Sequence, residues 1–410
     1  MSDSLSATAD AELVGIVPEE RTAVWPAVFA LSMGVFALVS AEFLPASVLT
    51  SIAADLSISV GAAGQTVTVT SLVGVAAAIF TPIVTSRFDR RLVLWSLLSL
   101  LALSSLVTAL ANGFVMLLAA RFLLGLALGG FWSMAPALTL RLVPAQSVPR
   151  ALALISAGVS AAFIGGGPLG AYLDSLIGWR MVFGLSAALA GVALLALLAT
   201  MPSLPPQAAP RLGTLGVLLS RPSIRLMLIS VLVIISGQFT GFTYIRPFLE
   251  HAPQLGVAAI TVVLLGYGLG NVVGNFAGGA VAGRGVKLAI VSFALAIGIL
   301  GLVMLQFGAS PIVAGIAVAL WGFAFGFAPV GFQTWMVRVA ADHAESASGL
   351  VTAAFLVAIA SGAVLGGLLV NHVGGLGPIG YMAAATLAGA LLVLVAGKEP
   401  PVAEAKTAVH

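Results

Sequence analysis

The sequence contains no cysteine and has few charged residues. Without cysteine, disulfides, thiolate metal sites and cysteine nucleophiles are all excluded. Charged residues make up 8% of the 410 positions, whereas about a quarter of an average soluble domain is charged. Hydrophobic residues make up 60%. Since a water-soluble fold has no way to bury that much apolar surface, we expect an integral membrane protein.

Long apolar runs fill most of the chain and are separated by charged or Pro/Gly-rich breaks. Because a spanning helix needs about 20 apolar residues, these runs predict an all-α membrane protein with twelve transmembrane helices. The helices are expected near residues 25–52, 62–85, 92–111, 114–140, 149–172, 181–201, 225–249, 258–282, 287–307, 311–337, 346–371 and 378–397.

The twelve helices are expected to form two pseudo-symmetric six-helix bundles. A proline-rich break divides them, and similar motifs recur in both halves at a nearly constant offset, as Arg141 and Arg338 do. Transporters built from repeats bind substrate near the midplane between them, which predicts a central cavity. The expected domains are a cytoplasmic tail (1–24), the N-terminal bundle (25–201), a cytoplasmic connector (202–224), the C-terminal bundle (225–397) and a second cytoplasmic tail (398–410).

Lysine and arginine are distributed asymmetrically. Most of them lie at alternate ends of the expected helices, and therefore on one side of the membrane. Since short cytoplasmic loops retain positive charge, both termini and the connector are expected in the cytoplasm. The net charge of +3 is thus explained by the basic residues of the cytoplasmic loops. Because the sequence has no basic patch interleaved with aromatic residues, this charge does not indicate nucleic-acid binding. We expect a monomer surrounded by membrane lipid.

Glu42 is the only carboxylate predicted deep in an apolar span. Burial makes a charged carboxylate costly, so Glu42 is the candidate for reversible protonation and proton coupling. Arg121 lies inside another span at a similar predicted depth, cannot lose its proton, and is expected to pair with Glu42. Coupling requires that this pair breaks during transport. The alternative is a structural carboxylate locked to a cation.

Polar and aromatic residues within the spans are candidates for substrate contact. Amides and flat rings suit an uncharged planar ligand, although packing between helices or an interfacial belt is an alternative for each. Arg246, near the outer edge of its helix, is a candidate for gating or substrate binding, and the alternative is an interfacial charge paired with Glu250. The candidates are Gln65, Trp132, Gln238, Tyr244, Arg246, Asn271, Asn275, Trp321, Gln333 and Trp335.

No metal site or cofactor is expected. The histidines are not clustered with carboxylates at metal-ligand spacing. The chain also lacks a Walker-type loop, which leaves a proton gradient rather than ATP hydrolysis as the energy source. An enzyme embedded in the membrane would need a histidine or a second carboxylate near Glu42, and a sensor usually carries a soluble domain. Both are remote alternatives to a transporter.

Two runs resemble motifs of the drug:proton antiporters in the major facilitator superfamily. RFLLGLALGG (121–130) is similar to their arginine-containing motif in helix four, and GVSAAFIGGGPLG (158–170) to their antiporter motif in helix five. The resemblance extends from Trp25 to Val395, and it puts Glu42 where these antiporters carry an acidic residue. The antiporter-motif residues are Gly158, Gly166, Gly167, Pro168 and Gly170.

More narrowly, the chain resembles bacterial purine ribonucleoside efflux pumps. The matching runs include EFLP (42–45), AGQTVTVT (63–70), LALGGFW (126–132) and TYIRP (243–247). The resemblance implies export of inosine- or guanosine-like nucleosides in exchange for protons across a bacterial inner membrane. Efflux of sugars or of several drugs by the same fold is the alternative.

The cytoplasmic loop after the second helix departs from the family pattern. This loop normally ends in an acidic residue, a glycine and two basic residues, but here Ser86 stands at the acidic place and Asp89 at the glycine. Ser86 lacks the carboxylate of the inner-gate salt bridge that the resemblance implies, and Asp89 is the candidate for a partial replacement. The loop-motif residues are Arg87, Asp89, Arg90 and Arg91.

Overall fold

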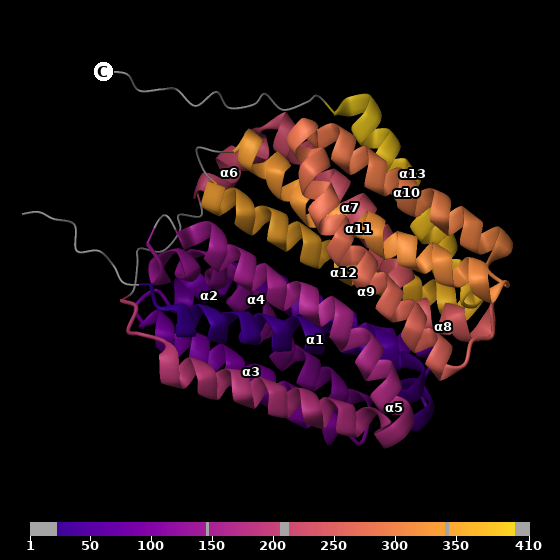
Figure 1. Cartoon of the computed structure of the whole chain (residues 1–410), viewed down its shortest axis with the longest axis horizontal. Coiled ribbons are helices and arrows are strands. Elements are labelled where there is room, and N and C mark those ends of the chain that lie inside the picture. The colour runs from indigo at the N-terminus through magenta and orange to yellow at the C-terminus, as the bar shows by residue number, and fades with distance from the viewer. Residues whose placement is uncertain (1–22, 145–146, 206–212, 341–343, 398–410) are drawn as a thin grey trace, which may run out of the picture.

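The computed structural model describes residues 23–144, 147–205, 213–340 and 344–397, and over these ranges the protein is a bundle of α-helices (Figure 1). Among the described residues, eleven helices are long and apolar enough to cross a membrane. The predicted all-α membrane fold is therefore confirmed. The helices are α1 Trp25–Asp55, α2 Val60–Val84, α3 Arg90–Ala109, α4 Phe114–Leu142, α5 Val148–Thr200, α6 Gly213–Ser220, α7 Pro222–Thr243, α8 Ile245–His251, α9 Val257–Arg284, α10 Val286–Phe307, α11 Pro311–Val339, α12 Ala344–Val373 and α13 Leu376–Ala396.

Helix α5 supplies two of the crossings. Its 53 residues would span roughly 80 Å at 1.5 Å per residue, against a hydrocarbon core of about 30 Å. The sequence predicted two helices, over residues 149–172 and 181–201, and the structure has a break between these two crossings, but it is much shorter than predicted. The helix breaks at Gly178 alone, where φ is 79°, a conformation that costs glycine no Cβ clash. Eleven helices with one double crossing give the twelve predicted spans.

The predicted helix over residues 225–249 is also wrong at its outer end. The structure breaks it at Tyr244, between α7 and α8. Pro247 lies four residues after Thr243, the last residue of α7. A proline ring clashes with the carbonyl four residues earlier and lacks the N–H that this carbonyl would accept from. The break therefore follows from the position of Pro247.

The helices form two groups that lie side by side. In Figure 1, α1–α5 make up the lower group and α6–α13 the upper group. We call them the first and second halves. Because the number of crossings is even, both described ends of the chain lie at the same end of the bundle, the left in Figure 1. We call this the inner end. The predicted tails fall mostly on residues 1–22 and 398–410, which lie outside the described residues.

Candidate functional site: the contact between the halves

Arg121 lies on α4 inside the first half and is 2% exposed. Its Nη1 donates a hydrogen bond of 3.1 Å to the carbonyl oxygen of Ala41, and its guanidinium carbon lies 4.7 Å from the centre of the Phe183 ring. Its Nε and Nη2 are buried without a hydrogen-bond partner. Since a guanidinium keeps its charge, the first half contains a permanent positive charge with unused donors.

The predicted ion pair between Glu42 and Arg121 is not formed in this structure. Arg121 instead donates to the backbone carbonyl of Ala41, the residue before Glu42. The Ala41 carbonyl would normally accept from the N–H four residues later, but that residue is Pro45, which has none. The orphan carbonyl therefore takes the guanidinium. The half-buried Glu42 side chain makes no ion pair or hydrogen bond with any described residue.

A cluster of phenylalanines joins the two halves beside Glu42. The ring of Phe43 lies 5.0 Å from that of Phe163 on α5 and is stacked on Phe239 of α7 at 5.9 Å. Phe325, the central residue of α11, completes it at 5.9 Å from Phe239. No sequence pattern distinguishes these rings from the rest of the 21 phenylalanines. We call Phe43, Phe163, Phe239, Phe242 and Phe325 the aromatic cluster.

Two predicted substrate residues, Gln238 and Trp321, are used inside the second half. The Trp321 indole donates to the Gln238 Oε1 at 2.5 Å, and the Gln238 Nε2 donates to the Tyr267 hydroxyl at 2.9 Å. Gln238 and Trp321 are fully buried and Tyr267 is 2% exposed. The three residues link α7, α9 and α11 through these hydrogen bonds, and the role of Gln238 and Trp321 in substrate contact stays a prediction.

The other predicted substrate residues have varied surroundings. Asn271 is 6% exposed and Asn275 is half-buried, one turn further along α9. The amide nitrogen of Gln65 lies 3.4 Å from the carbonyl oxygen of Gly61 in its own helix. Trp132 is half-buried on α4, Trp335 is buried on α11, and Gln333 is exposed.

At the outer end, Arg246 binds the first half through its side chain. Its Nη1 donates to Asp174 of α5 at 2.9 Å and to the Ser47 carbonyl oxygen of α1, and its Nε pairs with Glu250 at 2.8 Å. Thr50 of α1 donates to Glu250 at 3.1 Å. The predicted pairing of Arg246 with Glu250 is thus formed, and Arg246 also links α8 to α1 and α5. We call the set of Ser47, Thr50, Ser51, Asp174, Arg246 and Glu250 the outer cluster.

Asp174 was missed by the sequence analysis. The apolar span was predicted to end at residue 172, whereas α5 remains helical to Gly178. Asp174 is therefore a second carboxylate inside a spanning segment, 5% exposed at its side chain. It lies close to the outer end of its crossing, four residues before Gly178, whereas Glu42 lies in the interior of α1.

Tyr244 closes the outer end at a second point. Its hydroxyl donates to the Ala363 carbonyl of α12 at 2.9 Å and lies 3.5 Å from the Gly61 carbonyl of α2. The amide N–H of Gly61 donates to Asn371 of α12 at 3.1 Å. A Cβ on Gly64 would lie 1.9 Å from the Tyr244 hydroxyl. The hydrogen bonds between described residues of the two halves thus gather at the outer end.

The antiporter-motif glycines bring α5 close to α1. A Cβ on Gly158 would lie 2.5 Å from the Ser32 carbonyl oxygen, and one on Gly166 would lie 3.2 Å from Ser40. One on Gly170 would lie 2.4 Å from Leu44, whereas Gly167 has nothing within 4 Å. The backbone stays helical through Pro168. Gly158, Gly166 and Gly170 therefore allow α5 to pack closely against α1.

The loop motif at the inner end binds the start of the connector. Asp89 caps α3 by accepting from the Arg91 N–H at 2.8 Å, and it also accepts from the Ser203 hydroxyl and from the Leu204 N–H at 3.0 Å. Partial burial opposes ionisation of Asp89, but these hydrogen bonds and the charge of Arg91 outweigh it and hold its pKa below the ordinary value. Among the described residues, Asp89 bonds to α3 and to the start of the connector and to no residue of the second half. Arg90 is buried and donates to Thr85 at 3.1 Å, and Arg87 is exposed.

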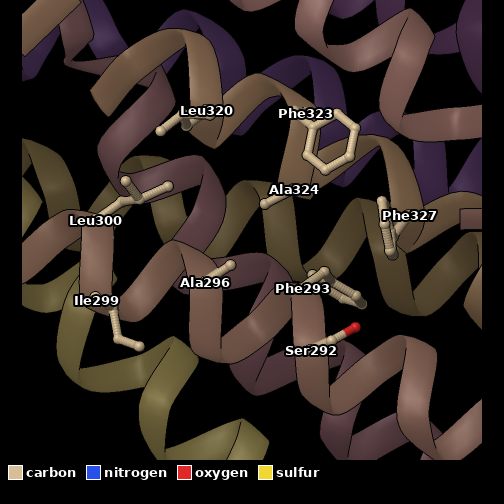
Figure 2. Close-up of a pocket in the computed structure, with 9 residues that line it drawn as sticks. All are labelled: Ser292, Phe293, Ala296, Ile299, Leu300, Leu320, Phe323, Ala324 and Phe327. Carbon is tan, nitrogen blue, oxygen red and sulfur yellow. The ribbon is translucent and has the colours of Figure 1, made fainter. Parts of the chain in front are cut away.

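A cavity of about 410 Å³ lies within the second half, between α10 and α11, and Figure 2 shows the residues that line it. Its lining is apolar except for the hydroxyl of Ser292, which donates to the Ala289 carbonyl of its own helix. Ile299 and Leu320 at its edge are 55% and 50% exposed, as expected for a surface in contact with lipid. None of the predicted substrate residues is among those that line it.

Comparison with known proteins agrees with this architecture. A sequence profile of the Major Facilitator Superfamily matches residues 25–355. The chain is 39% identical over 372 residues to the purine ribonucleoside efflux pump NepI of Salmonella paratyphi B, covering 91% of this chain and 92% of that protein. It is 40% identical, with the same coverage, to the pump of that name from Escherichia coli O1:K1.

Solved structures of low sequence identity share the fold. An inward-facing, unoccupied bacterial homologue of the human lysosomal transporter Spinster matches with a TM-score of 0.73 at 14% identity, over 93% of this chain and 96% of that one. A D-xylose-proton symporter matches with a TM-score of 0.73 at 16% identity, over 92% and 99%. The predicted family is therefore confirmed: the chain belongs to the Major Facilitator Superfamily, a family of membrane transporters rather than enzymes.

Proposed function

We propose that the protein exports purine ribonucleosides, such as inosine and guanosine, in exchange for protons across a bacterial cytoplasmic membrane. The relatives that cover nine-tenths of the chain are named purine ribonucleoside efflux pumps. One structural observation carries the proposal: Phe43 of the aromatic cluster directly follows Glu42. A planar base stacked in this cluster and a proton on Glu42 would occupy neighbouring places, so each can influence the binding of the other.

The chemistry of the two groups gives the order of events. In the outward-open state Glu42 takes up a proton, which removes a charge that is costly inside the membrane. The neutral carboxyl favours return to the inward-open state, where the proton leaves and a nucleoside binds against the aromatic cluster. Differential binding to the two states is what drives the exchange. The moving bodies are the two halves, residues 25–201 and 225–397, with both termini in the cytoplasm.

Arg121 lowers the cost of an ionised Glu42. The Arg121 guanidinium donates to the carbonyl of Ala41, the residue before Glu42, and its other two nitrogens are buried without a hydrogen-bond partner. A carboxylate that turns toward these donors after losing its proton would gain charge-assisted hydrogen bonds. The ion pair between Glu42 and Arg121 would then form in a different step of the transport cycle from the conformation in this structure.

Everted membrane vesicles test the proposal. Radiolabelled inosine, arabinose and chloramphenicol are supplied with and without a pH gradient, and we expect gradient-driven uptake of inosine alone. Glu42→Gln should abolish gradient-driven uptake but keep inosine counterflow, because a neutral side chain still permits exchange of substrate. Inosine uptake that ignores the gradient would refute proton coupling. Uptake of arabinose or chloramphenicol instead would favour sugar or multidrug efflux.

A further inference from the structure

Two asparagines on α9 have side chains without a hydrogen-bond partner. Asn271 and Asn275 are both described residues, and neither amide bonds to any group of the protein. Asn271 is only 6% exposed. The amide atoms of both asparagines are absent from the fully enclosed polar atoms without partners among the described residues, so these amides keep some access to their surroundings. An accessible amide that bonds to no group of the protein can donate to and accept from a ligand.

The asparagines lie on the side of α9 that faces the first half. A Cβ on Gly268 would lie 2.3 Å from the Phe163 carbonyl oxygen of α5, so the two helices touch there. Asn271 and Asn275 lie three and seven residues further along α9, on the same helical face. The lipid face of α9 is a different one, marked by Val273 and Phe276 at 60% and 78% exposure.

Two serines on α5 match the asparagines in height. Ser160 and Ser156 lie three and seven residues before Phe163, on the face that also carries Asp174. Neither hydroxyl of these described residues forms a hydrogen bond, unlike most serines in the spans, which bond to their own helix. Because α5 and α9 run in opposite directions, Ser160 lies level with Asn271, and Ser156 level with Asn275.

Both polar stripes can be reached from the inner end. On α5, Ser160 is half-buried and Ser156 is exposed, and on α9, Asn271 is buried and Asn275 half-buried. Exposure thus increases toward the inner end on each helix.

The two levels lie about 5 Å and 10 Å inward of the contact at Phe163. Phe163 belongs to the aromatic cluster, and its neighbour Phe43 lies further outward, because Leu44 lies against Gly170 of α5. Phe325 of the same cluster lies level with the asparagines, since a Cβ on the adjacent Gly326 would lie 2.3 Å from the Asn271 carbonyl oxygen.

We propose that Ser156, Ser160, Asn271 and Asn275 form a two-level hydrogen-bonding site for the nucleoside, which rests on the proposed function above. At the outer level, the Asn271 amide faces the base beside the aromatic cluster. A carboxamide donates and accepts side by side, which matches the adjacent N1–H and C6 carbonyl of an oxopurine. At the inner level, Asn275 and Ser156 bind the ribose hydroxyls.

Competition binding to the purified full-length protein tests each level separately. Radiolabelled inosine is displaced by inosine, by purine riboside, which lacks the C6 oxygen and N1–H, and by 2′-deoxyinosine. We expect the wild type to prefer inosine over each analogue by about tenfold, the factor that corresponds to roughly one good hydrogen bond. Asn271→Ala should abolish the preference over purine riboside and keep the preference over 2′-deoxyinosine. Asn275→Ala and Ser156→Ala should do the reverse.

Matched variants make the outcome decisive. Thr261→Ala removes a hydroxyl from the same helix, but that hydroxyl bonds to the Val257 carbonyl of its own backbone, so both preferences should stay at wild-type values. Asn271→Ser replaces Asn271→Ala if the latter does not purify as a monodisperse protein, with the same expected loss. Unchanged preferences in the folded Asn271 and Asn275 variants would overturn the site. Inosine binding with these preferences but without proton-driven uptake would overturn the antiport and leave the site standing.

Discussion

Arg246 of α8 and Asp174 of α5 form an ion pair of 2.9 Å across the two halves, with side chains 7% and 5% exposed. The pair exists only while the outer ends of the halves are together. Removing one partner of a buried pair leaves an uncompensated charge, at a cost of about 3–5 kcal/mol. Because opening the outer end would hydrate both groups, that cost falls on the closed state alone.

Asp174→Asn is therefore expected to favour opening of the outer end. The natural chain has no cysteine, so Ser47→Cys gives a single reporter; its hydroxyl bonds only within α1, and its carbonyl is unchanged. Labelling from outside with a membrane-impermeant maleimide should accelerate by about tenfold or more, since about 1.4 kcal/mol corresponds to that factor.

The matched control is Asp55→Asn. Asp55 pairs with Arg180 at the same end, but both belong to the first half and their side chains are 43% and 38% exposed. Surface pairs of this kind contribute about 0–1 kcal/mol, and this one does not link the halves, so labelling should stay at the wild-type rate. Equal labelling of the Asp174→Asn and Asp55→Asn proteins would show that the ion pair does not hold the outer end closed.

Pro45→Ala is expected to raise stability and weaken proton coupling. An alanine there supplies the N–H that the Ala41 carbonyl lacks, and this N–H competes with Arg121 for the same oxygen. Since a proline inside a helix costs about 3 kcal/mol, the melting temperature in detergent should rise. The number of protons moved per inosine, measured with a pH-sensitive dye in vesicles, should fall.

Pro222→Ala is the control for this substitution. Pro222 is the first residue of α7, a position at which proline costs little because its N–H would have no helical partner. We expect no change in coupling. A Pro45→Ala protein that moves protons at the wild-type ratio would exclude the bond between Ala41 and Arg121 from the coupling mechanism.

The helices were predictable from the sequence because the length and composition of apolar runs decide what spans a membrane. The exact position and length of each break were not, since hydropathy carries no information on backbone angles. Gly178 reverses the chain inside one apolar stretch. The spacing of Thr243 and Pro247 was a usable signal for the break at Tyr244.

The depth of the site residues in the membrane was predictable from the sequence, but the neighbours that their side chains face were not. Glu42 and Arg121 were correctly identified as charges inside spans, yet residues at equal depth can face different neighbours around a helix axis. The four-residue spacing of Ala41 and Pro45 marks the carbonyl that Arg121 binds. The partners of Gln238, Trp321 and Asp174 depend on how distant helices pack, which a single sequence does not specify.

Gly158→Ala is expected to destabilise the protein, while Gly167→Ala is not. The added methyl at Gly158 would lie 2.5 Å from the Ser32 carbonyl oxygen, which belongs to rigid backbone, whereas Gly167 has no neighbour within 4 Å. Overpacking of this kind costs about 1–3 kcal/mol, and alanine in an open helical position gains up to about 1 kcal/mol over glycine. Thermal unfolding of both variants in one detergent measures the difference. A Gly158→Ala protein as stable as Gly167→Ala would mean that α5 moves away from α1 without cost.

Asp89→Ala is expected to release the start of the connector from the first half. It removes the cap of α3, worth about 1 kcal/mol, and the acceptor for Ser203 and Leu204. Cleavage of the connector by a protease added at the inner face should become several-fold faster.

Because the folded-state pKa of Asp89 lies below its ordinary value, the stabilisation from the Asp89 hydrogen bonds is complete above about pH 4, the usual range of an aspartate. It is lost as the pH falls through the lowered pKa. The wild-type protein should therefore approach the cleavage rate of the variant only at strongly acidic pH, tested with an acid-active protease, and Arg87→Ala, at an exposed position in the same loop, should cleave like the wild type. A connector equally protected in Asp89→Ala would show that Arg141, which donates to the Pro205 carbonyl at 3.0 Å, holds it without Asp89.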